Sequence, residues 1–246
     1  MKYHFRIPFI ALVASVSCAH AQQQAVDAVG KWLSERTMSA ALADDGPGAM
    51  PEIKEGAYRI VTIDNLDAPE EVKAHFRSQM GNKGQGVIRV PKGTIPSIAE
   101  LLAVLPTAQR SAAVLRERLP SPPVTLRGTL LAGAEVIGME SSGALDGVKS
   151  SGLTRYFRVD ELGVVALNEE NFRASGMTIE VFAESLNTTV NDTPAQLELH
   201  EDGHGRAQAT LAWALGGKAL RLTVTGDGDA ARKGEALRSI ASGIVD

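Results

Sequence analysis

The sequence predicts an α+β fold: a mainly antiparallel sheet with a C-terminal helix packed on it, preceded by a mixed unit of helices and short strands. From residue 153 onward, segments with alternating apolar residues are separated by short turns, which is typical of antiparallel strands. The last segment, after the Asp227-Gly228-Asp229 turn, has a helical period instead, with apolar residues at Leu237, Ile240, Ala241 and Ile244. Before residue 120, helical and strand patterns alternate.

The first 21 residues have the three parts of a secretory signal peptide. Lys2 and Arg6 form a short basic start, residues 7–16 are apolar and uncharged, and Ala19-His20-Ala21 is an A-x-A cleavage site. The apolar run is shorter than the roughly 18 residues that a membrane span needs. We therefore expect residues 1–21 to be removed, with no transmembrane segment left, and the mature protein to be periplasmic or secreted.

The single cysteine, Cys18, lies inside this segment. A mature chain without cysteine has no disulfides, no thiolate catalysis and no cysteine metal sites. Cys18 has an alternative interpretation as the lipidation site of a bacterial lipoprotein. Ser15 stands where such a site normally has leucine, so export as a soluble protein is favoured over lipidation.

Composition further limits the partners that this chain can have. The formal net charge is −4, there are no basic clusters, and aromatic residues make up 4% of the chain. A mildly acidic protein of this kind is a poor partner for nucleic acid or for anionic membrane surfaces. We therefore expect no nucleic-acid partner.

The N-terminal half is predicted to alternate helices with short strands. A first-turn proline, Pro69, opens one helix, and Ser97 and Glu100 have the spacing of a capping box that opens another. The expected helices cover residues 22–43, 69–81, 97–105 and 108–119, and the expected strands cover residues 58–63 and 87–90.

The sharpest change of composition is Pro120-Ser121-Pro122-Pro123, a stiff, extended segment with three prolines in four residues. We predict an N-terminal α/β unit over residues 22–119, a proline-rich linker over 120–123, and a C-terminal unit over 124–246. In the competing arrangement, residues 58–63 and 87–90 contribute strands to a single sheet, and the proline segment is a surface connection.

After the proline segment the pattern is that of a meander closed by a helix. Trp213 falls on one of its strands and is expected to pack against the final helix. The Glu169-Glu170 pair is expected to be solvated in a turn. The expected strands cover residues 124–131, 135–139, 153–159, 164–167, 177–181, 197–199, 207–213 and 220–224.

The last part of the sequence, from Trp213 onward, resembles the ending of known bacterial domains. Trp213, the Gly216-Gly217 turn, Leu220 and Leu222, followed by the helix 237–244, resemble the strand–strand–helix ending of small exported bacterial domains of the PsbP-like and LolA/RseB-like kind. The resemblance covers about 35 residues and includes no catalytic motif. It implies an antiparallel sheet with a terminal helix laid on it, in a protein of the bacterial envelope.

The segment His200-Glu201-Asp202-Gly203-His204 has the H-E-x-x-H spacing of zinc peptidases. There, two histidines four apart on one helix face bind Zn²⁺, and the glutamate acts as general base on the metal-bound water. Here Leu197 and Leu199 alternate as in a strand, Asp202-Gly203 favours a turn, and Thr210 stands where a third histidine would follow. We expect a hairpin turn with solvated histidines rather than a metal site.

These observations predict an exported bacterial envelope protein that binds a partner protein or an apolar ligand, without catalytic residues or a cofactor. The alternative is a zinc-dependent hydrolase that uses His200 and His204 as ligands and Glu201 as base. The envelope assignment depends on the signal peptide and the C-terminal resemblance, and the alternative depends on residues 200–204 forming a helix.

We expect the mature protein to begin at Gln22, since the A-x-A site ends at Ala21. Intact mass and N-terminal sequencing of the exported protein check this. A mass that includes diacylglycerol on Cys18 would establish the lipoprotein instead.

Overall fold

The structure, a computed structural model, describes residues 27–36, 38, 56–81, 86–105, 112–143 and 149–246. The predicted signal peptide, residues 1–21, and the predicted mature start at Gln22 lie outside these ranges.

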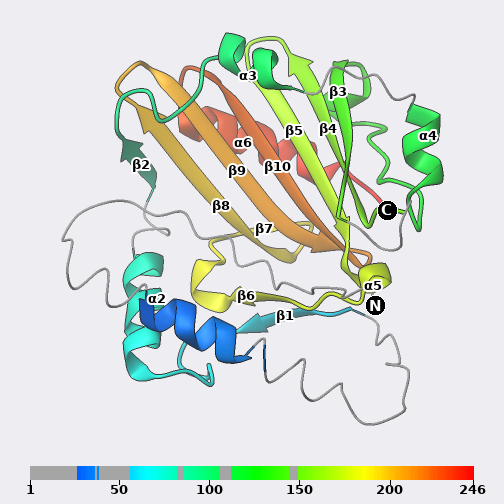
Figure 1. The fold of residues 1–246 in the computed structure, drawn as a ribbon. Helices are drawn as coiled ribbons and strands as arrows, with labels where there is room; N and C mark the ends of the chain where they lie inside the picture. The colour runs from blue at the N-terminus through cyan, green and yellow to red at the C-terminus, as the bar shows by residue number, and fades with distance from the viewer. Residues whose placement is uncertain (1–26, 37, 39–55, 82–85, 106–111, 144–148) are drawn as a thin grey trace.

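A large, mainly antiparallel sheet forms the centre of the described chain, as predicted (Figure 1). Its strand order is β2-β8-β9-β10-β5-β4-β3, and β7 pairs with β8 beside this path. β2 runs parallel to β8, and the other neighbours are antiparallel. The strands are β2 (Val87–Val90), β3 (Glu135–Ser142), β4 (Gly152–Val159), β5 (Gly163–Asn171), β7 (Thr188–Val190), β8 (Thr193–Asp202), β9 (Arg206–Leu215) and β10 (Lys218–Asp227).

The C-terminal helix, α6 (Ala230–Ser242), packs on one face of this sheet, so the predicted α+β class is confirmed. Asp229 caps its start by accepting a hydrogen bond from the Arg232 amide at 2.7 Å. Trp213, 2% exposed, lies in one core cluster with Leu237, Ile240 and Ile244, as the sequence predicts. The face of the sheet that meets α6 is therefore the apolar face of β8, β9 and β10.

A second, smaller apolar cluster lies in the N-terminal part. Helical residues 27–36 and α2 (Glu70–Gly81) pack beside a two-stranded parallel pair of β1 (Tyr58–Val61) and β6 (Ile179–Phe182). The buried members of the cluster are Val29, Trp32, Ile63, Leu66, Val72 and Phe76.

The short helices agree with the sequence-based predictions in part. The capping box of Ser97 and Glu100 is present at the start of α3 (Ile98–Val104). The helix predicted over 108–119 is described as α4 (Ala112–Glu117); residues 106–111 lie outside the described ranges. The other elements are the short helix α5 (Phe172–Ser175) and the 3-10 turns η1 (Leu130–Ala132) and η2 (Ala183–Ser185).

The strand predicted over residues 124–131 is wrong. The segment makes one isolated bridge, between Thr125 and Val245, and then turns into η1. Gly128 has a φ of 82°, and the Thr129 hydroxyl caps η1 by accepting from the Leu131 amide at 3.2 Å. A left-handed glycine followed by a capping threonine ends an extended segment, whatever the β-propensity of its apolar residues.

The two apolar clusters separate on either side of the proline segment. The large cluster draws its buried residues from Val124 to Ile244, and the smaller one from Val29 to Phe76. Strand pairing nevertheless crosses the boundary, because β2 joins β8 and β1 joins β6. Independent folding of residues 124–246 therefore remains a prediction, supported by the separate cores and opposed by the shared strand pairs.

Replacing Trp213 with alanine is expected to reduce the free energy of unfolding by about 3–5 kcal/mol, the range for deleting a large buried aromatic side chain. Denaturant titration measures this loss. Val104→Ala, at a site 77% exposed, is the control and should change stability by no more than about 0.5 kcal/mol. A comparably small loss for Trp213→Ala would contradict the packing described above.

A fragment of residues 124–246 should unfold cooperatively, because it contains the complete large cluster. Dispersed amide resonances and a sigmoidal denaturant curve are the expected results. An aggregated or molten fragment would show that β2 and residues 22–119 are needed to complete the fold.

Candidate functional site

The proline segment is the point at which four distant parts of the chain meet. A cleft of about 360 Å³ opens there, between the segment, the β5–α5 junction, the β9–β10 turn and the end of the chain. Its lining residues are Ser121, Pro122, Pro123, Asn171, Arg173, Ala174, Gly216, Lys218 and Asp246.

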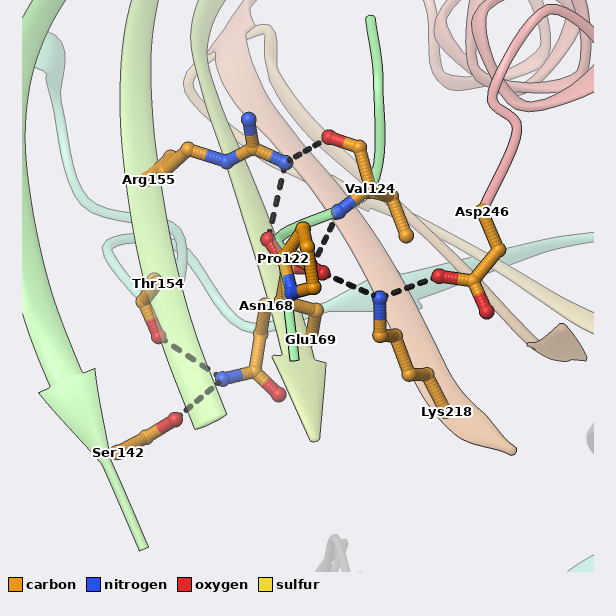
Figure 2. Close-up of polar contacts among 9 residues, drawn as sticks. All are labelled: Pro122, Val124, Ser142, Thr154, Arg155, Asn168, Glu169, Lys218 and Asp246. Carbon is orange, nitrogen blue, oxygen red and sulfur yellow. Dashed lines mark hydrogen bonds and ion pairs between the residues drawn. The ribbon is translucent and has the colours of Figure 1, made fainter. Parts of the chain in front are cut away.

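A buried ion pair lies beside this cleft (Figure 2). Glu169 on β5 is 3% exposed and Arg155 on β4 is 8% exposed, and their side chains meet at 2.9 Å. The Glu169 carboxylate also accepts a hydrogen bond from the Val124 amide at 2.8 Å, and Arg155 donates to the Val124 carbonyl at 3.1 Å. Glu169 and Arg155 therefore bind the backbone amide and the backbone carbonyl of Val124, the first residue after the prolines.

This pair corrects the expectation that Glu169 and Glu170 are solvated in a turn. β5 continues to Asn171, beyond the predicted end at Leu167, and Glu169 shares the core face with Val165 and Leu167. Arg155 is the inward-facing arginine in the otherwise apolar pattern of β4. Arg155 and Glu169 are thus charged residues at core-facing positions that are otherwise apolar, and the fold brings the two side chains into contact.

Burial dominates the electrostatics of the pair. Desolvation raises the pKa of Glu169, against the opposing effects of the Arg155 charge, the Val124 amide and the Lys218 charge. Desolvation also lowers the pKa of Arg155, against the attraction of Glu169. Arg155 Nε is buried and has no hydrogen-bond partner within the described part of the chain. Removing either charge would leave its partner buried and uncompensated.

Lys218 ties the same region to the end of the chain. Its ammonium group, on a residue 4% exposed, donates to the Pro122 carbonyl at 2.7 Å and forms an ion pair with Asp246. Asn171 also donates to the Ser121 hydroxyl at 3.0 Å. The proline segment is thus held at Ser121 and Pro122, and the residue that follows it is held at both of its backbone groups.

The opposite face of the sheet is polar. Asn168 lies there, because adjacent strand residues point to opposite faces, and it donates to Thr154 at 2.8 Å and to Ser142 at 3.4 Å (Figure 2). Tyr156 donates to Glu140, and burial together with this contact raises the pKa of Tyr156. The side chains on this face thus bond to one another across the strands.

The His200-Glu201-Asp202-Gly203-His204 segment is a strand end followed by a turn, as predicted. His200 and Glu201 are adjacent on β8 and so point to opposite faces, and His204 lies exposed in the β8–β9 turn. Glu201 accepts from the Ala230 amide at 3.1 Å, at the start of α6. The shared helical face that the zinc mechanism needs is absent from this segment. Within the described ranges, no group of three or more His, Cys, Asp or Glu residues is placed to hold a metal ion.

Asp202, which the sequence analysis considered only as a turn signal, accepts three hydrogen bonds from backbone amides. Its carboxylate accepts from the amides of His204 at 2.8 Å, Arg206 at 3.1 Å and Gly93 at 3.2 Å. Desolvation opposes ionisation, but these three amides outweigh it and lower the pKa of Asp202. Asp202 thus closes the β8–β9 hairpin and attaches to it the segment that follows β2.

No protein-family model, curated protein or solved structure matches this chain. No helix among the described residues combines the length and apolar character needed to cross a membrane.

Replacing Arg155 with methionine should reduce the free energy of unfolding by about 3–5 kcal/mol, because Glu169 is left as an uncompensated buried charge. The double variant Arg155→Met/Glu169→Leu should recover part of this loss, since it removes the uncompensated charge but leaves the Val124 amide and carbonyl without their partners. Urea titration of the two variants and the parent protein measures the difference. Equal losses in the single and double variants would mean that the packing of the arginine stem or the contacts with Val124, and not the uncompensated charge of Glu169, account for the loss.

Proposed function

We propose that this chain is an exported bacterial envelope protein that acts as a non-enzymatic binding module for a partner protein. Export is supported by the signal-peptide pattern of residues 1–21, and the envelope setting by the resemblance of the C-terminal stretch. The observation that carries the binding role is the polar sheet face opposite α6, which displays side chains from β8, β9, β10, β5 and β4.

We define the binding face as the central rows of this sheet surface. Strand register aligns Glu198, Thr210 and Thr223 in one row with Ala166 and Tyr156. The next row contains Gln196, Ala212, Arg221, Asn168 and Thr154. Arg221 is exposed, and most of the other side chains are half-buried. α3 contacts β5 at one end of the sheet, and Figure 1 shows the β1–β6 pair at the other.

The chemistry of the binding face favours a protein partner over an apolar ligand. Charges of both signs, Arg221 and Glu198, stand among hydroxyl and amide groups, and an apolar ligand would strip water from them without replacing its hydrogen bonds. A protein surface supplies such partners, and non-obligate interfaces have about the polarity of ordinary protein surface. The core side of the sheet is already filled, with Leu167, Leu211 and Leu222 fully buried.

Site-specific photo-crosslinking in the producing cell tests the proposal. A photo-reactive residue at Arg221 should give a discrete protein adduct, while the same residue at Arg238, exposed on α6 behind the sheet, is the matched control. Thr223→Arg should abolish the adduct without changing the unfolding curve. Equal adducts at both positions, or none at Arg221, would overturn the proposal. Lipid that co-purifies stoichiometrically would indicate an apolar ligand instead.

A further inference from the structure

The cleft beside Lys218 is separate from the binding face and differs from it in charge. Its lining contains two cations, Arg173 and Lys218, and one anion, Asp246. Asn171, the cross-strand neighbour of Lys218, and Ser121 add polar groups, and the Asn171 side chain is fixed by its hydrogen bond to Ser121. The lining therefore combines two cations, an anion and neutral polar groups, within a cleft large enough for a small ligand.

Lys218 is the cation that matters most in this lining, because its ammonium group is buried. The Lys218 side chain is 6% exposed, and a buried ammonium is stable only beside acceptors and an anion. The Pro122 carbonyl is one acceptor, and the Asp246 carboxylate is the anion. The site thus already holds one carboxylate, supplied by the chain itself.

The β9–β10 turn makes room for that carboxylate. Gly216 has a φ of 60° and Gly217 a φ of 97°, so both are in the left-handed region that favours glycine. A Cβ on Gly216 would overlap the Asp246 carboxyl group, and a Cβ on Gly217 would lie 3.3 Å from Arg173 Nε. The glycine pair lets an acidic and a guanidinium group approach the same turn.

Asp246 is held less tightly than Lys218. Its side chain is 31% exposed and can turn into solvent, while Val245 remains attached through its carbonyl, which accepts from the Thr125 amide at 2.8 Å. Rotation of Asp246 would leave the buried Lys218 ammonium without its ion-pair partner, because the other carboxylate acting on it, that of Glu169, is already paired with Arg155. The vacated position would then attract another carboxylate.

We propose that this cleft is a carboxylate-binding site, in which Asp246 is the resident occupant and the carboxylate of an external ligand replaces it against Lys218. Arg173 on the cleft wall supplies a second cation near the incoming group. The ligand class is a monocarboxylate, either a small organic acid or the free C-terminus of a peptide. This proposal does not depend on the partner protein proposed for the sheet face.

Chemical rescue tests the site directly. Asp246→Ala should be less stable than the parent protein, and saturating sodium acetate should raise its melting temperature by about 2–4 °C, the shift that a modest stabilisation gives in a chain of this size. The parent protein should respond less, because Asp246 competes for the same position. Glu161→Ala is the matched control, since Glu161 pairs with Arg232 on the exposed surface at 3.3 Å and is not among the residues that line this cleft.

The double variant Asp246→Ala/Lys218→Met should lose the acetate response, since the ammonium that binds the carboxylate is gone. If Asp246→Ala does not fold, Asp246→Asn keeps the shape of the side chain and replaces it in the same titration. An acetate shift no larger than that of Glu161→Ala, or equal to that in sodium chloride of the same ionic strength, would overturn the proposal.

A peptide with a free C-terminus and the same peptide with an amidated C-terminus then distinguish the two ligand sources. Tighter binding of the free peptide than of acetate would indicate a chain terminus. Equal binding of the free and amidated peptides, with acetate still active, would indicate a small organic acid.

Discussion

The arrangement of the C-terminal part depends on the two buried charges that hold the backbone of Val124. Glu169 accepts from the Val124 amide while Arg155 donates to its carbonyl, so a segment outside the sheet is fixed as firmly as a paired strand residue. Val124 then enters the large core, and Thr125 pairs with Val245. A buried ion pair contributes little net stability, because desolvation offsets its attraction. The ion pair instead fixes the position of Val124. An apolar pair of the same volume would fill the space without binding the backbone of Val124.

The alternation of strand residues lets β5 serve two surfaces at once. Glu169 points into the core and holds the proline segment, while Asn168, one residue earlier, points to the opposite face and bonds Thr154. Asn171, at the end of the same strand, reaches Ser121 in the cleft. The register that brings Glu169 to Arg155 therefore also fixes the polar rows of the binding face. A slip of one residue would exchange the two faces and disrupt both.

Periodicity predicted the elements well and their partners poorly. The long sheet strands, α6 and the capping box of α3 follow from local patterns, because hydrophobic spacing and capping chemistry are properties of neighbouring residues. The short strand β7 was not predicted. The burial of Glu169 depends on an arginine 14 residues away, and nothing near Glu169 distinguishes it from a solvated acid. The parallel pairing of β2 with β8 joins residues that are more than 100 positions apart in the sequence. The spacing of His200 and His204 likewise has its chemical meaning only on a helix, and here the strand separates them.

The N-terminal half has a structural role in the sheet, because its strand β2 pairs with the outer side of β8. β8 would otherwise present unpaired backbone groups along its outer side, a template for aggregation. β7 pairs with its first residues and β2 with its last. Between them, the Asn187 side chain accepts from the Leu197 amide at 2.8 Å and donates to the Leu197 carbonyl at 2.9 Å, as a neighbouring strand would. Because this edge is paired along its length, the partner protein that we propose would meet the β8 side of the sheet through side chains on its polar face rather than through its backbone.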